Sequence, residues 1–155
     1  MFKQILYDGF TKMSPYEVHR VVTFLFENQG KCVIGKNDIT SAIEYAMKDR
    51  PSFGGYVITM ENEEGKIVAA TVVNKTGMAG YGPENILVYF ATQENSRNYE
   101  ACRKLLDKTI KVAKEDIAFL VTPDNPWKAI FRKLGFESKL LEMKYRKPNR
   151  KSIAS

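Results

Sequence analysis

The sequence predicts an α/β or α+β domain in which helices cover the faces of a β-sheet. Two short apolar runs, 86–91 and 117–121, suit buried strands and lie on either side of a long amphipathic helical pattern. A β-branched hairpin precedes them. The expected order is strand, two helices, hairpin, strand, helix, strand, helix and strand. This mixture excludes a helical bundle and a β-sandwich.

Length and composition narrow the class of protein. The chain has 155 residues, which suits one domain of roughly 100 to 200 residues. Its longest apolar stretch, 67–73, is far shorter than the roughly 20 residues that cross a bilayer, and the N-terminus shows no signal peptide. Two cysteines and one histidine argue against a disulfide framework and a zinc hydrolase. We expect a cytoplasmic protein with one domain, 1–146, and a frayed basic tail, 147–155.

The first half of the chain contains one strand and two helices. Residues 2–7 are expected to form a short strand. Ser14 then caps a helix, with Pro15 in its first turn and Glu17 completing a capping box. A second helix, capped by Asn37 or Asp38, ends before a proline. The apolar faces of these helices contain Val18, Val21, Val22 and Leu25, and Ile39, Ala42, Ile43 and Ala46. Gly30 provides the exit from the first helix.

After the two helices, the spacing of the hydrophobic residues changes from one typical of helices to one typical of strands. Segments 55–61 and 66–74 form the hairpin around a turn at 62–65. The long helix runs from about 96 to 114 between the two buried strands, and its inner face contains Cys102, Leu105, Leu106 and Thr109.

Two more elements complete the expected order. A short helix opens at Asn125 and ends at Gly135. A final strand alternates, with Leu141, Met143 and Tyr145 on one side.

Several of these segments resemble the GNAT superfamily of N-acetyltransferases. Residues 129–136, AIFRKLGF, look like the late helix of that family, which ends in an aromatic residue, Glu-Lys and Leu-Gly-Phe. Residues 121–125 resemble the preceding strand exit, and Leu105-Leu106 matches a double leucine in the CoA-binding helix. The resemblance covers residues 55–145 well. The first two helices match the family only by their order along the chain. It implies a mixed, centrally splayed sheet of about six or seven strands flanked by four helices.

The resemblance also implies a function. GNAT enzymes transfer an acetyl group from acetyl-CoA, their cosubstrate, to a primary amine by direct attack. The family binds pyrophosphate with the motif Arg/Gln-x-x-Gly-x-Gly/Ala, which falls here on 97–102: Arg97 fits, but Glu100 and Cys102 replace the small residues. Either the loop binds CoA with adjusted geometry or it no longer binds CoA tightly. By position, the cofactor-binding residues are Phe90, Ala91, Thr92, Arg97, Asn98, Tyr99, Glu100, Ala101, Cys102, Arg103, Asn125 and Phe131.

The groups that would move protons are weakly defined. Many family members protonate the leaving thiolate with a tyrosine at the position of Phe131, which has no hydroxyl. Tyr89 and Tyr145 are substitutes, although each also suits a strand aromatic. Glu61 and Glu84 are candidate bases, and His19 is a weaker one. A chain of water molecules would also serve.

Two alternatives stay open. A GNAT-like domain with little or no catalytic activity would act as a CoA-binding or protein-interaction module, as the losses at Glu100 and Phe131 suggest. The net charge of +6 would also suit a nucleic acid, but the charge is spread along the chain without a recognition motif, so this alternative is less favoured. We expect acetyl-CoA and an amine as partners and no membrane. The sequence names no acceptor and leaves a homodimer open.

Overall fold

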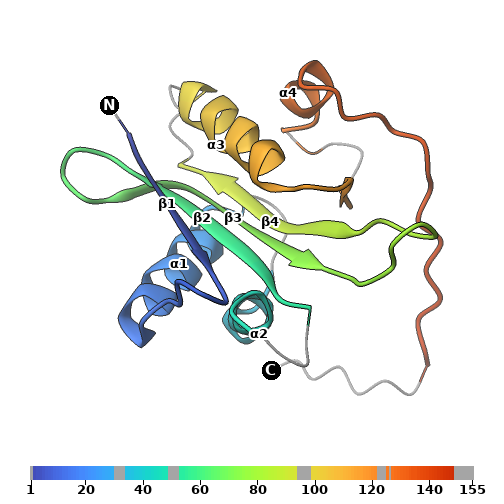
Figure 1. Cartoon of the computed structure of the whole chain (residues 1–155), viewed down its shortest axis with the longest axis horizontal. Helices are drawn as coiled ribbons and strands as arrows, with labels where there is room; N and C mark the ends of the chain where they lie inside the picture. Colours follow the sequence, from blue (N-terminus) through green and yellow to red (C-terminus); the bar gives the residue numbers. More distant parts are fainter. Residues whose placement is uncertain are drawn as a thin grey trace.

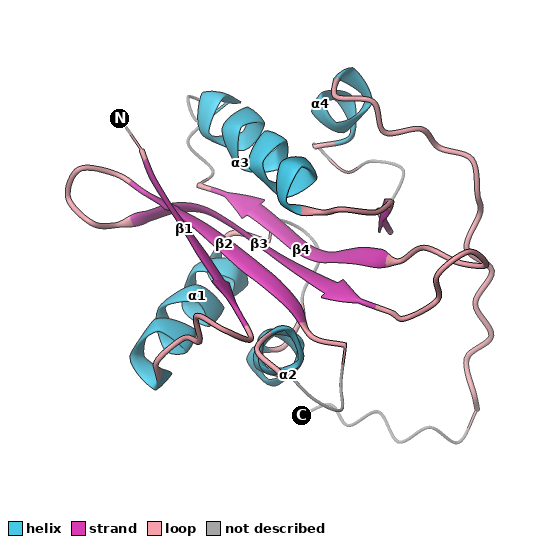
Figure 2. Cartoon of the chain, in the orientation of Figure 1, coloured by secondary structure: helices cyan, strands magenta, loops and turns pink. Residues whose placement is uncertain are grey.

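A five-stranded mixed sheet organises the computed structural model, which describes residues 2–29, 34–48, 53–93, 99–121, 125 and 127–148. The described residues also form four helices, and Figures 1 and 2 show how they pack around this sheet. The elements are β1 Lys3–Asp8, α1 Pro15–Glu27, α2 Lys36–Ala46, β2 Gly55–Glu61, β3 Ile67–Lys75, β4 Asn85–Thr92, α3 Tyr99–Val112, β5 Ile117–Phe119 and α4 Lys128–Lys133.

The strands lie in sequence order across the sheet. Neighbours from β1 to β4 run antiparallel, whereas β4 and β5 run parallel. Helices α1 and α2 cover one face and α3 and α4 cover the other (Figure 1). The predicted α/β class and four flanking helices are therefore confirmed.

Two apolar clusters hold these layers together. On the α3 side, Cys102, Leu105 and Leu106 are buried against β2, β3 and β4, as the helical spacing predicts. On the α1–α2 side, Val21 and Ile43 pack against the opposite face of the same strands. Burying a side chain of this size stabilises the fold by about 1.5–3 kcal/mol.

The N-termini of the first two helices confirm one predicted cap and correct the other. At α1, the Ser14 hydroxyl accepts a hydrogen bond from the Glu17 N–H (3.2 Å), and the Glu17 carboxylate accepts one from the Ser14 N–H (2.9 Å). The predicted capping box is therefore confirmed. The predicted cap of α2 is wrong: the helix begins earlier, with Gly35 as its N-cap, and Asp38 lies in its first turn. The predicted exit at Gly30 lies outside the described residues.

The strand count differs from the prediction. The described residues form five strands, not six or seven, and 141–145 forms none. Every residue from 137 to 148 is exposed and lies outside helix and strand. An alternating pattern makes a strand only where a neighbouring edge supplies hydrogen-bond partners, and the described part of β5 has no partner other than β4. Residues 149–155 of the predicted tail lie outside the described ranges.

Among the described residues, no helix is long and apolar enough to span a bilayer.

Candidate functional site

The sheet opens between β4 and β5. These parallel strands pair only at their starts, where Asn85, Ile86 and Leu87 face Ile117, Ala118 and Phe119. β4 continues to Thr92, and no described residue of β5 pairs with this later part. Among the described residues, the β4–β5 ladder therefore ends at Leu87, although β4 itself continues to Thr92. This is the splay that the family resemblance predicts.

A β-bulge lies where the splay begins. On the β3 side, Val72 faces Tyr89 but Val73 faces Leu87, so Val88 is an extra residue in β4. A bulge twists its strand and re-aims the backbone N–H groups beside it, and bulges are common next to active sites. The sequence did not reveal it, because Val88 lies in an unbroken apolar run.

Aromatic side chains close the inner end of the splay. The ring of Phe90 meets the ring of Phe131 from α4 at 5.1 Å and that of Trp127 at 6.0 Å, both edge-to-face. Phe131 also contacts Phe119 of β5 at 4.8 Å and Phe136 at 5.0 Å. Such pairs add about 0.5–1.5 kcal/mol beyond burial. The cluster thus fixes α4 against both strands of the splay.

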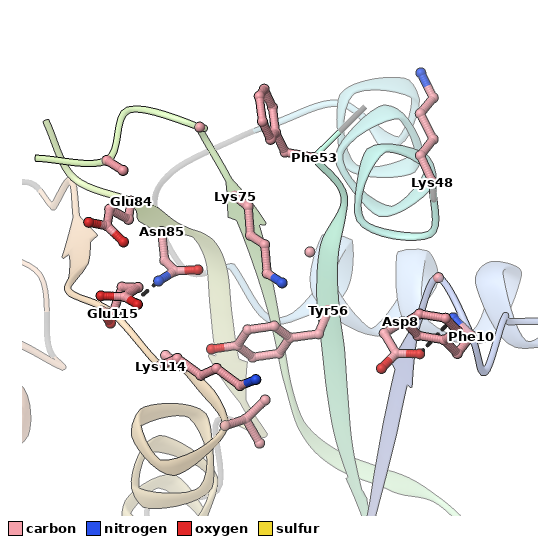
Figure 3. A pocket seen from close by; sticks show the side chains of 16 residues that line it. Asp8, Phe10, Lys48, Phe53, Tyr56, Lys75, Glu84, Asn85, Lys114 and Glu115 are labelled. Atoms are coloured by element: carbon pink, nitrogen blue, oxygen red, sulfur yellow. Dashed lines mark hydrogen bonds between the residues drawn. The ribbon is translucent and has the colours of Figure 1, made fainter. Parts of the chain in front are cut away.

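A half-open cavity of about 840 Å³ lies at the opposite end of the sheet. It forms where β3 ends at Lys75, β4 begins at Asn85 and the segment after α3 carries Lys114. Figure 3 shows the side chains of Lys75 and Lys114 extending toward the ring of Tyr56. The Tyr56 hydroxyl donates to the carbonyl of Thr109 at 2.9 Å, and burial raises the pKa of that phenol above its usual range. This cavity is separated from the splay by the length of β4.

Comparison with known proteins decides the fold. No protein-family model and no curated protein matches the sequence. Among solved structures, the chain is similar to a ribosomal-protein-alanine N-acetyltransferase from Brucella melitensis biovar Abortus (TM-score 0.63, 10% identity, covering 94% of this chain and 99% of the other). It is similar to the aminoglycoside 6'-N-acetyltransferase AAC(6')-Ih from Acinetobacter baumannii (TM-score 0.64, 10% identity, 95% and 98% covered). The chain has the GNAT fold.

A third similar structure was solved with CoA bound. It is the aminoglycoside N-acetyltransferase AAC(6')-Iy, with a TM-score of 0.63, 12% identity, and 96% of this chain and 97% of the other covered. At these identities the likeness shows the fold, and the roles of individual residues rest on their own geometry.

The predicted phosphate-binding positions surround the start of α3. Arg97 and Asn98 lie outside the described residues. Tyr99 and Glu100 are exposed in the first turn, and the Glu100 carboxylate pairs with the Lys104 ammonium group at 3.0 Å. The hydrogen bond from Lys104 lowers the pKa of Glu100. Glu100 is thus directed along the helix.

The next residues of that motif divide between core and surface. Ala101 and Cys102 are buried, whereas Arg103 is exposed. Burial raises the pKa of the Cys102 thiol to about 12, so it holds no thiolate at neutral pH. Of these three residues, only Arg103 has a side chain that a ligand could reach.

The remaining predicted binding residues contribute backbone or packing. Phe90, Ala91 and Thr92 are buried, so their side chains pack in the core. The Asn125 side-chain oxygen accepts a hydrogen bond from the Trp127 N–H at 2.8 Å just before α4. Phe131 is buried within the aromatic cluster.

The predicted proton-transfer residues are not brought together. Glu61 ends β2, with β3 between it and β4, and its carboxylate pairs with Arg20 at 3.1 Å. Glu84 precedes β4 and lines the cavity, at the other end of that strand from Thr92. Partial burial and the nearby Glu115 carboxylate raise the pKa of Glu84. Tyr89 packs on the α1–α2 side of β4, and Tyr145 is exposed.

Proposed function

We propose that this chain is an N-acyltransferase that transfers an acetyl group from acetyl-CoA to a primary amine of a small molecule or peptide. The observation that carries the proposal is the bulged second half of β4, which lies beyond the described ladder to β5 and opens from it at the end of the sheet where α3 begins. CoA-bound AAC(6')-Iy, which has a similar fold, supports this choice of cosubstrate.

The free edge of β4 suits the pantetheine arm of the cosubstrate. Pantetheine contains two amides, and the described ladder between β4 and β5 stops before residues 88–92. An extended chain with amides can take the place of the missing strand through backbone hydrogen bonds. This binding mode tolerates any side chain, so the burial of Phe90, Ala91 and Thr92 does not oppose it.

The start of α3 suits the pyrophosphate. A helix N-terminus presents unpaired N–H groups and the positive end of its dipole to an anion. Arg103 adds an exposed positive charge one turn into α3, and Glu100 is paired with Lys104. We assign the start of α3, with Arg103 and the Glu100–Lys104 pair, to phosphate binding with an adjusted geometry.

The transfer itself is a direct attack on the thioester. The neutral amine nitrogen forms a bond to the carbonyl carbon, the carbon–sulfur bond breaks, and the thiolate leaves with the electron pair. Backbone N–H groups beside the bulge at Val88 stabilise the oxyanion that develops. The amine loses its proton through water, because Glu61 is paired with Arg20 and Glu84 is remote. Water also protonates the thiolate, since Phe131 has no hydroxyl.

Binding and chemistry can be tested separately. Calorimetry with acetyl-CoA measures binding, and the release of free thiol in the presence of amines measures transfer. Arg103→Gln should weaken acetyl-CoA binding by up to about fivefold, because an exposed ion pair contributes about 0.2–1 kcal/mol. Lys111→Gln, in the last turn of the same helix, is the matched control and should leave the affinity unchanged. Absence of binding at millimolar acetyl-CoA would rule the proposal out.

A second candidate function keeps the binding and loses the chemistry. It is favoured by Phe131, which stands at the expected tyrosine position and is held among three other rings. Such a domain would bind CoA as a sensor or interaction module. Tight binding of acetyl-CoA without thiol release for any class of amine would select this candidate, whereas brisk turnover would reject it.

A further inference from the structure

The half-open cavity of about 840 Å³ takes no part in the proposed acyl transfer. It lies where β3 ends, β4 begins and the chain leaves α3, whereas the splay opens beyond Leu87, toward the other end of β4. Its volume is within the range of about 300–1,000 Å³ that small-molecule sites occupy. The cavity is therefore large enough for a second ligand, at a distance from the reacting groups.

Hydrogen bonds hold the walls of this cavity in place. The Lys75 N–H donates to the Gly54 carbonyl at 2.8 Å, and the Lys75 carbonyl accepts a hydrogen bond from the Tyr45 hydroxyl at 2.7 Å. On the β4 side, the buried Asn85 side chain donates to the Asp116 carbonyl at 3.1 Å and so ties the segment after α3 to β4. The backbone on both sides of the cavity is thus fixed before any ligand arrives.

One part of the lining is apolar and tightly packed. The ring of Phe53 lies so close to Gly77 that a Cβ atom at that glycine would overlap the ring. The ring of Tyr56 also lines the cavity, and the hydrogen bond from its hydroxyl to the Thr109 carbonyl holds it in place. Val112 extends this surface at the end of α3. An apolar group of a ligand would therefore meet a rigid apolar wall.

Two lysine side chains converge inside the cavity. Figure 3 shows Lys75, from the end of β3, and Lys114, from the segment after α3, both extending toward the Tyr56 ring, while Lys48 points away from them. In the part of the chain that the structure describes, neither converging ammonium group pairs with a carboxylate. Two like charges that converge repel each other, and an anion between them offsets that repulsion. The pair is therefore suited to a carboxylate.

Two glutamates line the same cavity on its β4 side. Figure 3 shows Glu84 and Glu115 next to Asn85, and neither carboxylate has a basic partner within the described ranges. Partial burial and the Glu115 carboxylate raise the pKa of Glu84, which shows that a nearby positive charge is lacking. The third lining carboxylate, Asp8, accepts hydrogen bonds from two N–H groups of its own turn. These carboxylates would repel a simple anion but attract a ligand that also carries an ammonium group.

We propose that this cavity binds a free α-amino acid with an apolar side chain. The carboxylate of the ligand lies between Lys75 and Lys114, its ammonium group meets the two glutamates, and its side chain packs on the apolar wall. A molecule with both charges meets each charged group of the lining with the opposite sign. This amino acid is not the acyl acceptor, because the cavity and the splay lie at opposite ends of β4. The inference does not rest on acyl transfer, and either function proposed above is compatible with it.

Calorimetry with three matched ligands tests which charges the cavity recognises. Phenylalanine carries both charged groups, phenylpropanoate lacks the ammonium group, and phenethylamine lacks the carboxylate. We expect phenylalanine to bind about tenfold or more tightly than either analogue, because each analogue loses a charge-assisted contact. A preference smaller than about tenfold over either analogue, or no binding of phenylalanine and leucine at millimolar concentration, would overturn the proposal.

Variants of the two lysines test where the amino acid binds. Lys75→Gln and Lys114→Gln should each weaken phenylalanine binding about tenfold and so remove its advantage over phenethylamine. Lys3→Gln, at the other end of the sheet, is the matched control and should change nothing. All three lysines are exposed, so the variants should keep the fold, which circular dichroism checks. Unchanged phenylalanine binding in both cavity variants would place the amino acid elsewhere and contradict the assignment, without bearing on acetyl-CoA binding.

Discussion

The carboxylate of Glu100 lies 3.0 Å from the ammonium group of Lys104, one turn farther along α3. Glu100 replaces the expected glycine of the phosphate-binding motif, where its charge would repel a phosphate. Both side chains of the pair are exposed, and the ion pair partly balances that charge on the surface of the same helix. The start of α3 therefore repels an anion less strongly than the sequence alone indicates.

Removing the charge of Glu100 should strengthen CoA binding. In Glu100→Gln, the Lys104 ammonium loses its partner near the proposed phosphate position. We expect the affinity to rise by up to about fivefold by calorimetry, since an exposed pair of charges interacts by about 0.2–1 kcal/mol. Asp107→Asn, which breaks the Asp107–Lys111 pair farther along α3, is the control and should change nothing. Weaker binding in Glu100→Gln would place the phosphates elsewhere.

Truncating Phe131 should destabilise the fold strongly. Its ring contacts Phe90, Phe119 and Phe136, so Phe131→Ala leaves a cavity between α4 and the two splayed strands. We expect a loss of about 3–5 kcal/mol in the free energy of unfolding, measured with urea. Phe10→Ala removes the same ring from a site that is 97% exposed and should be nearly neutral. Similar losses for the two variants would show that the aromatic cluster contributes little.

Acid should weaken the attachment of α1 to β1. The Glu17 carboxylate accepts hydrogen bonds from the Ser14 N–H and from the Tyr7 hydroxyl, both at 2.9 Å, and these lower its pKa. A carboxyl with a lowered folded-state pKa contributes stability above its ordinary value of 4.5, and that stability is lost as pH falls through the folded value. Thermal unfolding between about pH 7 and pH 3 should therefore depend less on pH in Glu17→Gln than in the wild type. Equal slopes would contradict the assignment.

Neutralising Glu84, in contrast, should stabilise the fold at neutral pH. Partial burial and the Glu115 carboxylate raise the pKa of Glu84, so its folded state holds a proton more tightly than its unfolded state. The charged form is therefore unfavourable at neutral pH, and its cost disappears as pH falls below 4.5. Glu84→Gln should raise the melting temperature at about pH 7 and have little effect at about pH 4. Glu137→Gln, in the exposed segment that follows α4, is the control and should change neither value.

Local signals predicted most of the elements. The capping box of Ser14 and Glu17 needs only residues within one turn, and the inner face of α3 needs only the spacing of Cys102, Leu105 and Leu106. Both were confirmed. The cap of α2 was misplaced, because Gly35 holds that position without any side-chain hydrogen bond and so leaves little signal in the sequence.

The candidate site was only partly accessible to sequence reasoning. The family resemblance predicted the splay between β4 and β5, which the pairing confirms. The bulge at Val88 was missed, because it exists only relative to Val72 and Val73 on the neighbouring strand. Glu61 looked like a free carboxylate, because Arg20, its partner, lies 41 residues earlier in the chain.

The sequence alone determined the secondary structure of the core and the family that the chain resembles, since hydrophobic period, caps and short motifs act over a few residues. Only the tertiary structure decided which side chains neutralise one another, where β4 bulges, and that the alternating segment 141–145 lies outside helix and strand. Those outcomes depend on contacts between residues far apart in the chain. Local propensity cannot rank such contacts, because each is stabilised only after the sheet has brought its two partners together.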